Sequence, residues 1–243
     1  MPRVGPQAVR GRAETIRMIA REARQTLRAH RYGALGTLSK KLDGYPFGSI
    51  TPYLVDHDGS LLILISILAE HTKNILHDPR VSVITHDQRD PHILSQGRVT
   101  VIGNAEPEQK RKTAGLRYLR YFPEAQTYLA MHDFAFFRIR PVAIRYIGGF
   151  GKIRWVDIKK YAVACAEQFA RQEESLLAEL NAKSKTTVRK LLQQRYGIEA
   201  ADMRAIGLDC DGLDIRSGEQ VWRLDYPEAA TEPSLDALRL MSG

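Results

Sequence analysis

Apolar residues recur at helical spacing near the start of the chain and form short extended runs further on. Every third or fourth residue is apolar within residues 14–31, which predicts an amphipathic helix there, with Gly33 as its stop. The positions that carry this period are Ile16, Ile19, Ala20, Ala23 and Leu27. The polar positions between them are rich in arginine, so we expect a basic helix face.

Extended runs dominate the next part of the chain, and only two helical stretches, 72–76 and 106–131, interrupt them. The runs are residues 34–40, 48–56, 60–68, 81–87, 97–106 and 135–149. The Asp-Gly pair at 58–59 is a hairpin signal, and Gly103 is expected to kink or turn the fifth run. This pattern predicts a six-stranded, mostly antiparallel sheet that closes or nearly closes into a β-barrel.

The pattern changes near residue 161, where a small α+β domain is predicted. Its expected elements are helices over 162–180 and 187–196, strands over 203–210, 212–217 and 219–226, and a last helix from Ser234. Gly197 is the expected stop of the second helix. The chain then divides into a flexible tail over 1–13, a barrel domain over 14–160 and the small domain over 161–243, which is a mainly β plus α+β architecture.

Charge is distributed unevenly between the two domains. Residues 1–160 carry 26 Lys and Arg against 14 Asp and Glu, whereas residues 161–243 carry 10 against 14. The basic domain is expected to attract phosphates or carboxylates, with a solvated basic surface as the alternative. We do not expect nucleic-acid binding, because aromatic residues that could stack on bases are absent around the arginines of the first helix.

The composition is typical of a cytoplasmic protein. The longest apolar run, residues 61–65, is too short to cross a membrane. The two cysteines, Cys165 and Cys210, make neither a disulfide framework nor a pair at metal-ligand spacing, so we expect no metal site and no export. No Ser-His-Asp or Cys-His arrangement stands out, so the sequence assigns no catalytic residue.

Polar residues gather at one point of the apolar pattern, within residues 66–74. Ser66 supplies a hydroxyl from a predicted strand, and Thr72 and Asn74 open a short helix that must end before Pro79, since proline has no amide hydrogen. Hydroxyls and free amides at the start of a helix form a cradle for phosphate. The alternative is that Thr72 only caps the helix and that its neighbours are solvated.

These residues carry a resemblance to a known family. The run Ser66-x-Leu68-Ala69-x-His71-Thr72-x-Asn74, followed by "DPR" at 78–80 and "GRVTVIGNAE" at 97–106, resembles the pyridoxamine 5'-phosphate oxidase-like FMN-binding split barrels. The stretches "YPFGSITPYLVDHDGSLLILIS", "HDFAFFRIRPV" and "IGGFGKIRW" are most similar to the haem-utilisation branch of that family, the HugZ/HutZ-type proteins. The resemblance covers residues 14–157, and the rest resembles the small α+β domain often fused behind this barrel.

The resemblance implies a homodimer that binds FMN or haem in clefts between its subunits. The residues implied around an FMN phosphate are Ser66, His71, Thr72 and Asn74, with Arg98 adding charge and Ser49 facing the flavin ring. Asp133 is implied as an acid near the cleft, with a turn or cap role as the alternative. For His71 the alternative is a capping role, and for Arg98 it is a solvent-exposed strand position.

The chain departs from the haem-utilisation branch in its histidines. Haem degradation there needs an iron ligand, normally a histidine late in the chain, but all seven histidines lie at or before His132. Arg154 stands where some relatives carry histidine, and protonated arginine cannot bind iron. The small domain keeps Asn181 but lacks the histidines that relatives carry beside it. The leading hypothesis is therefore an FMN-dependent oxidoreductase. A haem-binding or haem-degrading protein is the alternative, and a regulatory module with a vestigial cofactor site is the third.

Overall fold

The computed structural model describes residues 6–87, 91–92, 96–149, 153–183, 185–199 and 202–235, with side chains from residue 14 onward. Two compact units make up the chain. Unit 1 consists of Met1–Arg111 and Leu129–Ala162, and unit 2 consists of Lys112–Tyr128 and Val163–Gly243. Unit 2 thus takes in a segment from the middle of the chain, inside the expected barrel domain. The predicted boundary at 160/161 lies close to the third crossing between the units, at 162/163.

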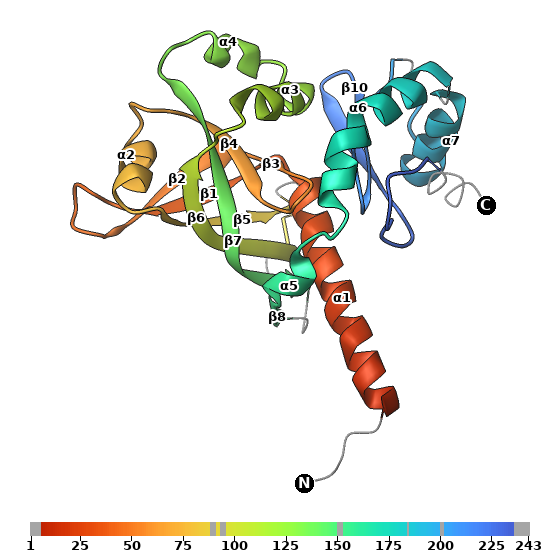
Figure 1. The fold of residues 1–243 in the computed structure, drawn as a ribbon, viewed down its shortest axis with the longest axis horizontal. Coiled ribbons are helices and arrows are strands. Elements are labelled where there is room, and N and C mark those ends of the chain that lie inside the picture. Colours follow the sequence, from red (N-terminus) through yellow and green to blue (C-terminus); the bar gives the residue numbers. More distant parts are fainter. Residues whose placement is uncertain are drawn as a thin grey trace. The chain divides into compact units, whose positions relative to one another are not determined.

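Unit 1 is built on a curled antiparallel sheet that forms a half-barrel (Figure 1). Its strands are β1 (Tyr32–Leu38), β2 (Pro46–Pro52), β3 (Leu54–Val55), β4 (Leu61–Ser66), β5 (Arg80–His86), β6 (Gly97–Pro107), β7 (Phe134–Gly148) and β8 (Ile153–Val156). They pair in the order β2-β1-β5-β6-β7-β4-β3, and β8 adds to β7. The antiparallel barrel class is confirmed. The sheet has more strands than expected because the second run breaks at Tyr53 and because β8 was not predicted.

Helix α1 (Pro6–Ala29) packs its apolar stripe onto this sheet and buries Ala20, Ala23 and Leu27 completely. It begins at Pro6, inside the segment expected to be a flexible tail, and proline is well suited to the first turn of a helix. The basic face is not all solvated. Arg24 is buried, and its Nη1 donates to the carbonyl oxygen of Tyr161 at 2.9 Å.

Glycines set the turns and close approaches of the sheet. Gly59 has φ of +86° and makes the predicted hairpin between β3 and β4. At Gly103 the register of β6 against β7 shifts by a bulge, which is the predicted kink. Gly33 does not stop the helix as expected. It lies inside β1, where a Cβ would stand 2.7 Å from the carbonyl oxygen of Ile84 on β5.

Short helices complete unit 1. They are α2 (Glu70–His77) and α5 (Ile158–Tyr161). Helix α2 packs against β1, β2 and β6, and it ends before Pro79 as predicted. The core between helices and sheet contains fully buried Leu35, Ile63 and Val83. Leu35 and Val83 alternate with outward residues along β1 and β5, whereas β4 is buried on both faces from Leu61 to Ile65.

Unit 2 combines a three-stranded antiparallel sheet with helices from two parts of the chain. Its elements are α3 (Arg111–Tyr121), α4 (Ala125–Leu129), α6 (Ala166–Lys183), α7 (Lys185–Tyr196), β9 (Arg204–Asp209), β10 (Gly212–Ser217) and β11 (Gln220–Asp225). The two helices and three strands predicted after residue 161 are confirmed, and Pro123 separates α3 from α4. The predicted last helix from Ser234 lies almost wholly outside the described residues.

No helix in the described part of the chain is both long enough and apolar enough to span a membrane.

Candidate functional site

The end of strand β4 and the start of helix α2 form the core of the candidate site. Ser66 is the last residue of β4, and its Oγ donates to Oδ2 of Asp133 at 2.9 Å. The same Oγ accepts the backbone N–H of Leu68 at 3.1 Å. The backbone N–H of Ile67 donates to the carbonyl oxygen of Asp133 at 2.6 Å. Asp133 therefore fixes the β4–α2 loop from the neighbouring strand, and its carboxylate already holds the Ser66 hydroxyl hydrogen.

Thr72 is fully buried inside α2 rather than at its cap. The N-cap position is Ala69, which has no side chain that could bond the free amides, so the predicted cap role of Thr72 is wrong. Its Oγ1 donates instead to the carbonyl oxygen of Ser66 at 2.6 Å. This bond ties the first turn of the helix to the strand that precedes it.

Asn74 is also fully buried and joins α2 to the β1–β2 hairpin. Its Nδ2 donates to Oγ1 of Thr37 at 3.0 Å, and its Oδ1 accepts the backbone N–H of Lys40 at 2.9 Å. Both ends of the amide are thus occupied by the fold. Asn74 acts as a structural clamp, and in this structure neither polar atom of its side chain is free for a ligand.

Two predicted residues keep polar atoms without partners. Nε2 of His71 and Oγ of Ser49 are inaccessible to solvent and form no hydrogen bond with the described residues. Burial lowers the pKa of His71, so its imidazole is neutral at pH 7. The backbone N–H groups of Glu70 and His71, at the exposed start of α2, likewise have no partner in the described chain. These atoms are the hydrogen-bonding groups of the predicted phosphate cradle that have no partner within the fold.

Arg98 does not join this group within one chain. It lies at the start of β6, opposite Ile147 near the end of β7, whereas Ser66 lies opposite Phe134 at the start of β7. Arg98 and Ser66 are therefore separated by almost the whole length of β7, because β6 and β4 both run antiparallel to it. His132, the last histidine of the chain, is exposed in the turn before Asp133.

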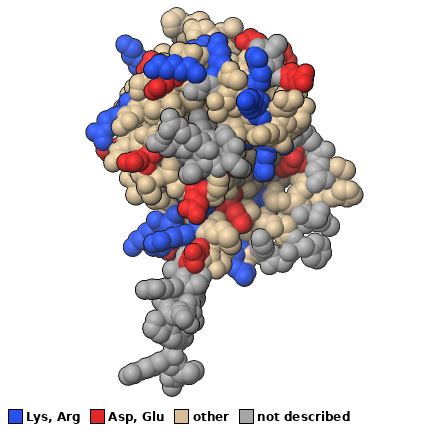
Figure 2. All heavy atoms as spheres, turned by 90° about the vertical axis from the view of Figure 1, so that its right-hand side faces the viewer, with Lys and Arg blue, Asp and Glu red and all other residues tan. Residues whose placement is uncertain are grey.

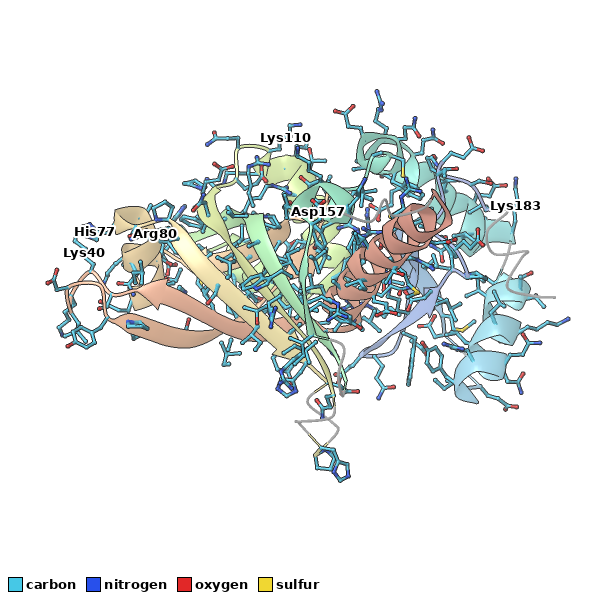
Figure 3. All side chains as sticks on the ribbon, turned by 90° about the horizontal axis from the view of Figure 1, so that it is seen from below. Lys40, His77, Arg80, Lys110, Asp157 and Lys183 are labelled. Atoms are coloured by element: carbon cyan, nitrogen blue, oxygen red, sulfur yellow. The ribbon has the colours of Figure 1, made fainter. Side chains whose placement is uncertain are left out.

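A basic tip surrounds α2. Lys40, His77 and Arg80 lie together at one end of unit 1 (Figure 3). Arg80 forms an ion pair with Asp78 at 2.6 Å, and this guanidinium lowers the pKa of the Asp78 carboxyl to about 2. Lys73 reaches Glu70 at 3.7 Å. The sequence did not indicate that Lys40 belongs to this basic tip, because only the pairing of β1 with β2 brings Lys40 to α2.

The outer face of the sheet exposes small and apolar residues across several strands. Ile50, Ala34 and Ile84 lie side by side on β2, β1 and β5, and Ile50 is 66% exposed and Ile84 38% exposed. Ile102 continues the face on β6 at 39% exposure. Strand alternation could have identified these positions, because each stands at an outward position where a solvated sheet would carry a polar residue.

Arginines border this outer face at one end. Thr100 on β6 lies opposite Arg145 on β7, and Arg98 lies two residues before Thr100 on the same face. The guanidinium of Arg145 stacks over the ring of Trp155 on β8 at 5.1 Å. Trp155 is itself 61% exposed. The sheet therefore presents an apolar surface with fixed cations along one edge, which suits a flat apolar ligand with carboxylates.

Comparisons with known proteins agree with this fold. A solved structure from Agrobacterium tumefaciens, described as a protein of unknown function, matches with a TM-score of 0.73 and 24% identity over 94% of both chains. The heme-binding protein of Mycobacterium smegmatis matches at 28% identity and a TM-score of 0.57, over 92% of this chain and 94% of that one. The chloroplastic non-canonical heme oxygenase HOZ of Arabidopsis thaliana is 28% identical over 87% of this chain and 68% of its own length.

The family itself is shown by a model that covers more than half of the chain. The model described as the CREG β-barrel matches residues 14–163, which takes in the sheet of unit 1. The chain belongs to the CREG β-barrel family.

Proposed function

We propose that the protein binds haem on the outer face of the unit 1 sheet, between two copies of the chain. The observation that supports this proposal most is the make-up of that face, which carries exposed Ile50, Ile84 and Ile102 beside Arg98 and Arg145. A haem is a flat apolar ring with carboxylates at one edge. The isoleucines would cover the ring, and the arginines would hold the propionates.

A second copy of the chain completes the proposed site. One sheet face covers only one side of a flat ring, and exposed apolar residues on several adjacent strands are typical of an interface. A twofold dimer would bring residues of the second copy over the other side of the ring, and its symmetry would form two equivalent clefts. The homodimer is therefore part of the proposal, as is a cytoplasmic location.

The similar proteins support haem over other flat ligands. The Mycobacterium smegmatis protein is described as heme-binding and the Arabidopsis thaliana protein as a heme oxygenase, and each is 28% identical over most of this chain. When bound, haem would supply the electron and oxygen chemistry. The residues of this chain would bind and orient the ring and exclude water from it.

FMN is the second candidate, because of uncommitted donors at the start of α2. The N–H groups of Glu70 and His71 would be free to meet a phosphate at a helix N-terminus, and Nε2 of His71 and Oγ of Ser49 are further polar atoms without a partner in the described residues. The protein would then be an FMN-dependent oxidoreductase, with the flavin supplying the redox chemistry. The internal bonds of Ser66, Thr72 and Asn74 weaken this candidate, because they leave fewer donors for the phosphate.

Substitution of Arg98 distinguishes the two candidates. If haem binds the outer face, Arg98→Ala should weaken haem binding by about tenfold, the effect of one lost charged hydrogen bond. Arg171→Ala is the matched control, since Arg171 is an exposed arginine of α6 in unit 2 that pairs with Glu167. An unchanged haem affinity for Arg98→Ala, or a loss for the control alone, would place the ligand elsewhere.

A further inference from the structure

Unit 2 contains a pocket of its own that the proposed cofactor site does not use. Its volume is about 450 Å³, and it lies between α6, the start of α7, β9 and one residue of α3. That size is within the range of small-molecule sites in proteins. The residues that carry the argument are Arg120, Glu174, Asn181, Lys185, Asp202 and Arg204.

The floor of the pocket is fixed by side chains that cover the outer edge of β9. Asn181 on α6 donates from Nδ2 to the carbonyl oxygen of Ala205 at 3.0 Å and accepts the N–H of Ala205 at 2.8 Å. It thus takes the place of a neighbouring strand. Nε of Arg120 donates to the carbonyl oxygen of Ile206 at 2.8 Å. Such a floor is held in place before any ligand arrives.

Arg120 is held by a buried acid behind the pocket. Glu173 accepts from Nη2 of Arg120, from Nε of Arg117 at 3.1 Å and from the N–H of Leu208 at 3.0 Å. This leaves Nη1 of Arg120 without a partner in the described residues. Arg120 therefore offers the pocket one fixed donor.

The rim carries charges of both signs that pair with nothing in the described chain. Lys185 and Arg204 are basic, Glu174 and Asp202 are acidic, and none of the four forms an ion pair or side-chain hydrogen bond with a described residue. Elsewhere on α6 the exposed acids are paired one turn apart, as in Glu167–Arg171 and Glu179–Lys183. Figure 2 shows basic and acidic side chains interspersed on the face that it displays.

Two details explain why these charges are unpaired and where the pocket is positive. One turn after Glu174 on α6 stands Ala178, which leaves space where a basic partner would fit. Lys185 begins α7, and a helix start already has a positive potential. Apolar Leu177 and Met203 also line the pocket. The pocket thus offers cationic groups, anionic groups and apolar side chains.

We propose that this pocket binds a small zwitterion of amino-acid or dipeptide type. The ligand's carboxylate would meet Lys185, Arg204 and the free Nη1 of Arg120, and its ammonium group would meet Glu174 and Asp202. An apolar side chain of the ligand would lie against Leu177 and Met203. The proposal does not depend on which cofactor unit 1 binds.

The test is titration of the full-length protein with glycyl-leucine, followed by calorimetry and amide chemical shifts. We expect saturable binding, with shifts at residues of α6 and β9. N-acetyl-leucinamide, which has the same side chain without either charge, and 4-methylpentanoate, which has only the carboxylate, should bind at least about tenfold more weakly. Equal binding of either analogue, or no saturable binding of glycyl-leucine, would overturn the proposal.

Two variants of pocket residues test where glycyl-leucine binds. Glu174→Gln and Arg204→Ser should each weaken glycyl-leucine binding by about tenfold, the effect of one lost charged hydrogen bond. Both side chains are exposed and unpaired, so the thermal midpoint should not change. Glu179→Gln is the matched control, because Glu179 is an exposed acid of the same helix that pairs with Lys183 outside the pocket. Unchanged affinity in both pocket variants would overturn the assignment.

Discussion

The hydroxyl of Ser66 donates to the carboxylate of Asp133 across two adjacent strands, at 2.9 Å. Both residues were implied as parts of a cofactor cleft, and the structure joins them to each other. A hydroxyl whose hydrogen is held by a carboxylate is a poor donor to a phosphate, and the carboxylate repels that anion. The hydrogen bond between Ser66 and Asp133 would have to break before Ser66 could donate to an anionic ligand.

A double-mutant cycle measures how strongly this pair holds the β4–α2 loop. Ser66→Ala and Asp133→Ala should each lower the free energy of unfolding by about 1–2 kcal/mol, the effect of a hydrogen bond to a charged group. The double variant should lose less than the sum, since the two changes remove one shared interaction. Urea unfolding gives all three values. Strictly additive losses would show that the pair contributes nothing in solution.

Asn74 should be far more costly to replace than an exposed asparagine. Asn74→Ala leaves the buried Oγ1 of Thr37 and N–H of Lys40 without their partner, so we expect a loss of about 2–3 kcal/mol in the free energy of unfolding. Asn104 on β6 is exposed, and Asn104→Ala should change stability by less than about 0.5 kcal/mol. Equal losses in the two variants would contradict the clamp role of Asn74.

His71 should make stability depend on pH. Burial lowers its pKa below the ordinary value of 6.5, so the unfolded chain takes up a proton that the folded chain refuses. The contribution of His71 is therefore complete above about pH 6.5 and is lost as the pH falls through the lower folded pKa. Urea unfolding between about pH 7.5 and 5 should show a shallower decline for His71→Gln than for the wild type. Parallel declines would mean that the imidazole is solvated.

The dimer depends on the outer sheet face in this account. The wild type should have twice the mass of one chain in light scattering after gel filtration, and Ile50→Asp should shift it to the monomer, because the substitution buries a charge at the interface. Leu116→Asp on α3 is the control. Leu116 is 58% exposed and Ile50 66%, but Leu116 lies in unit 2, outside that face. A monomeric wild type, or equal effects of both substitutions, would remove the proposed interface.

Much of the fold could be predicted because local signals and burial agree there. Alternation along residues 81–87 and 97–106 and the Asp-Gly turn at 58–59 were sufficient for β5, β6 and the hairpin before β4. The start of α1 at Pro6 was missed, since residues 1–13 carry positive charge without an apolar run, although the first turn of a helix accepts proline. The grouping of α3 and α4 with unit 2 could not be predicted from the sequence, because it depends on contacts between distant segments, such as Arg117–Glu173.

The candidate site was harder to predict, because residue type does not show which polar atoms the fold itself uses. Thr72 and Asn74 have the chemistry of a phosphate cradle, yet both are consumed by internal hydrogen bonds. Arg98 has the right charge, but antiparallel pairing places it at the opposite end of β7 from Ser66. Neither these internal bonds nor the strand register that separates Arg98 from Ser66 can be read from the sequence alone.

The most direct test of the haem proposal is an absorbance titration of the purified protein with haemin, repeated in the presence of excess FMN. The account predicts a saturable Soret band with roughly one haem per chain, as two equivalent clefts of a twofold dimer require. Excess FMN should leave the titration unchanged if the two ligands use different parts of unit 1. No saturable band, with stoichiometric binding of FMN instead, would contradict the assignment of haem to the outer face.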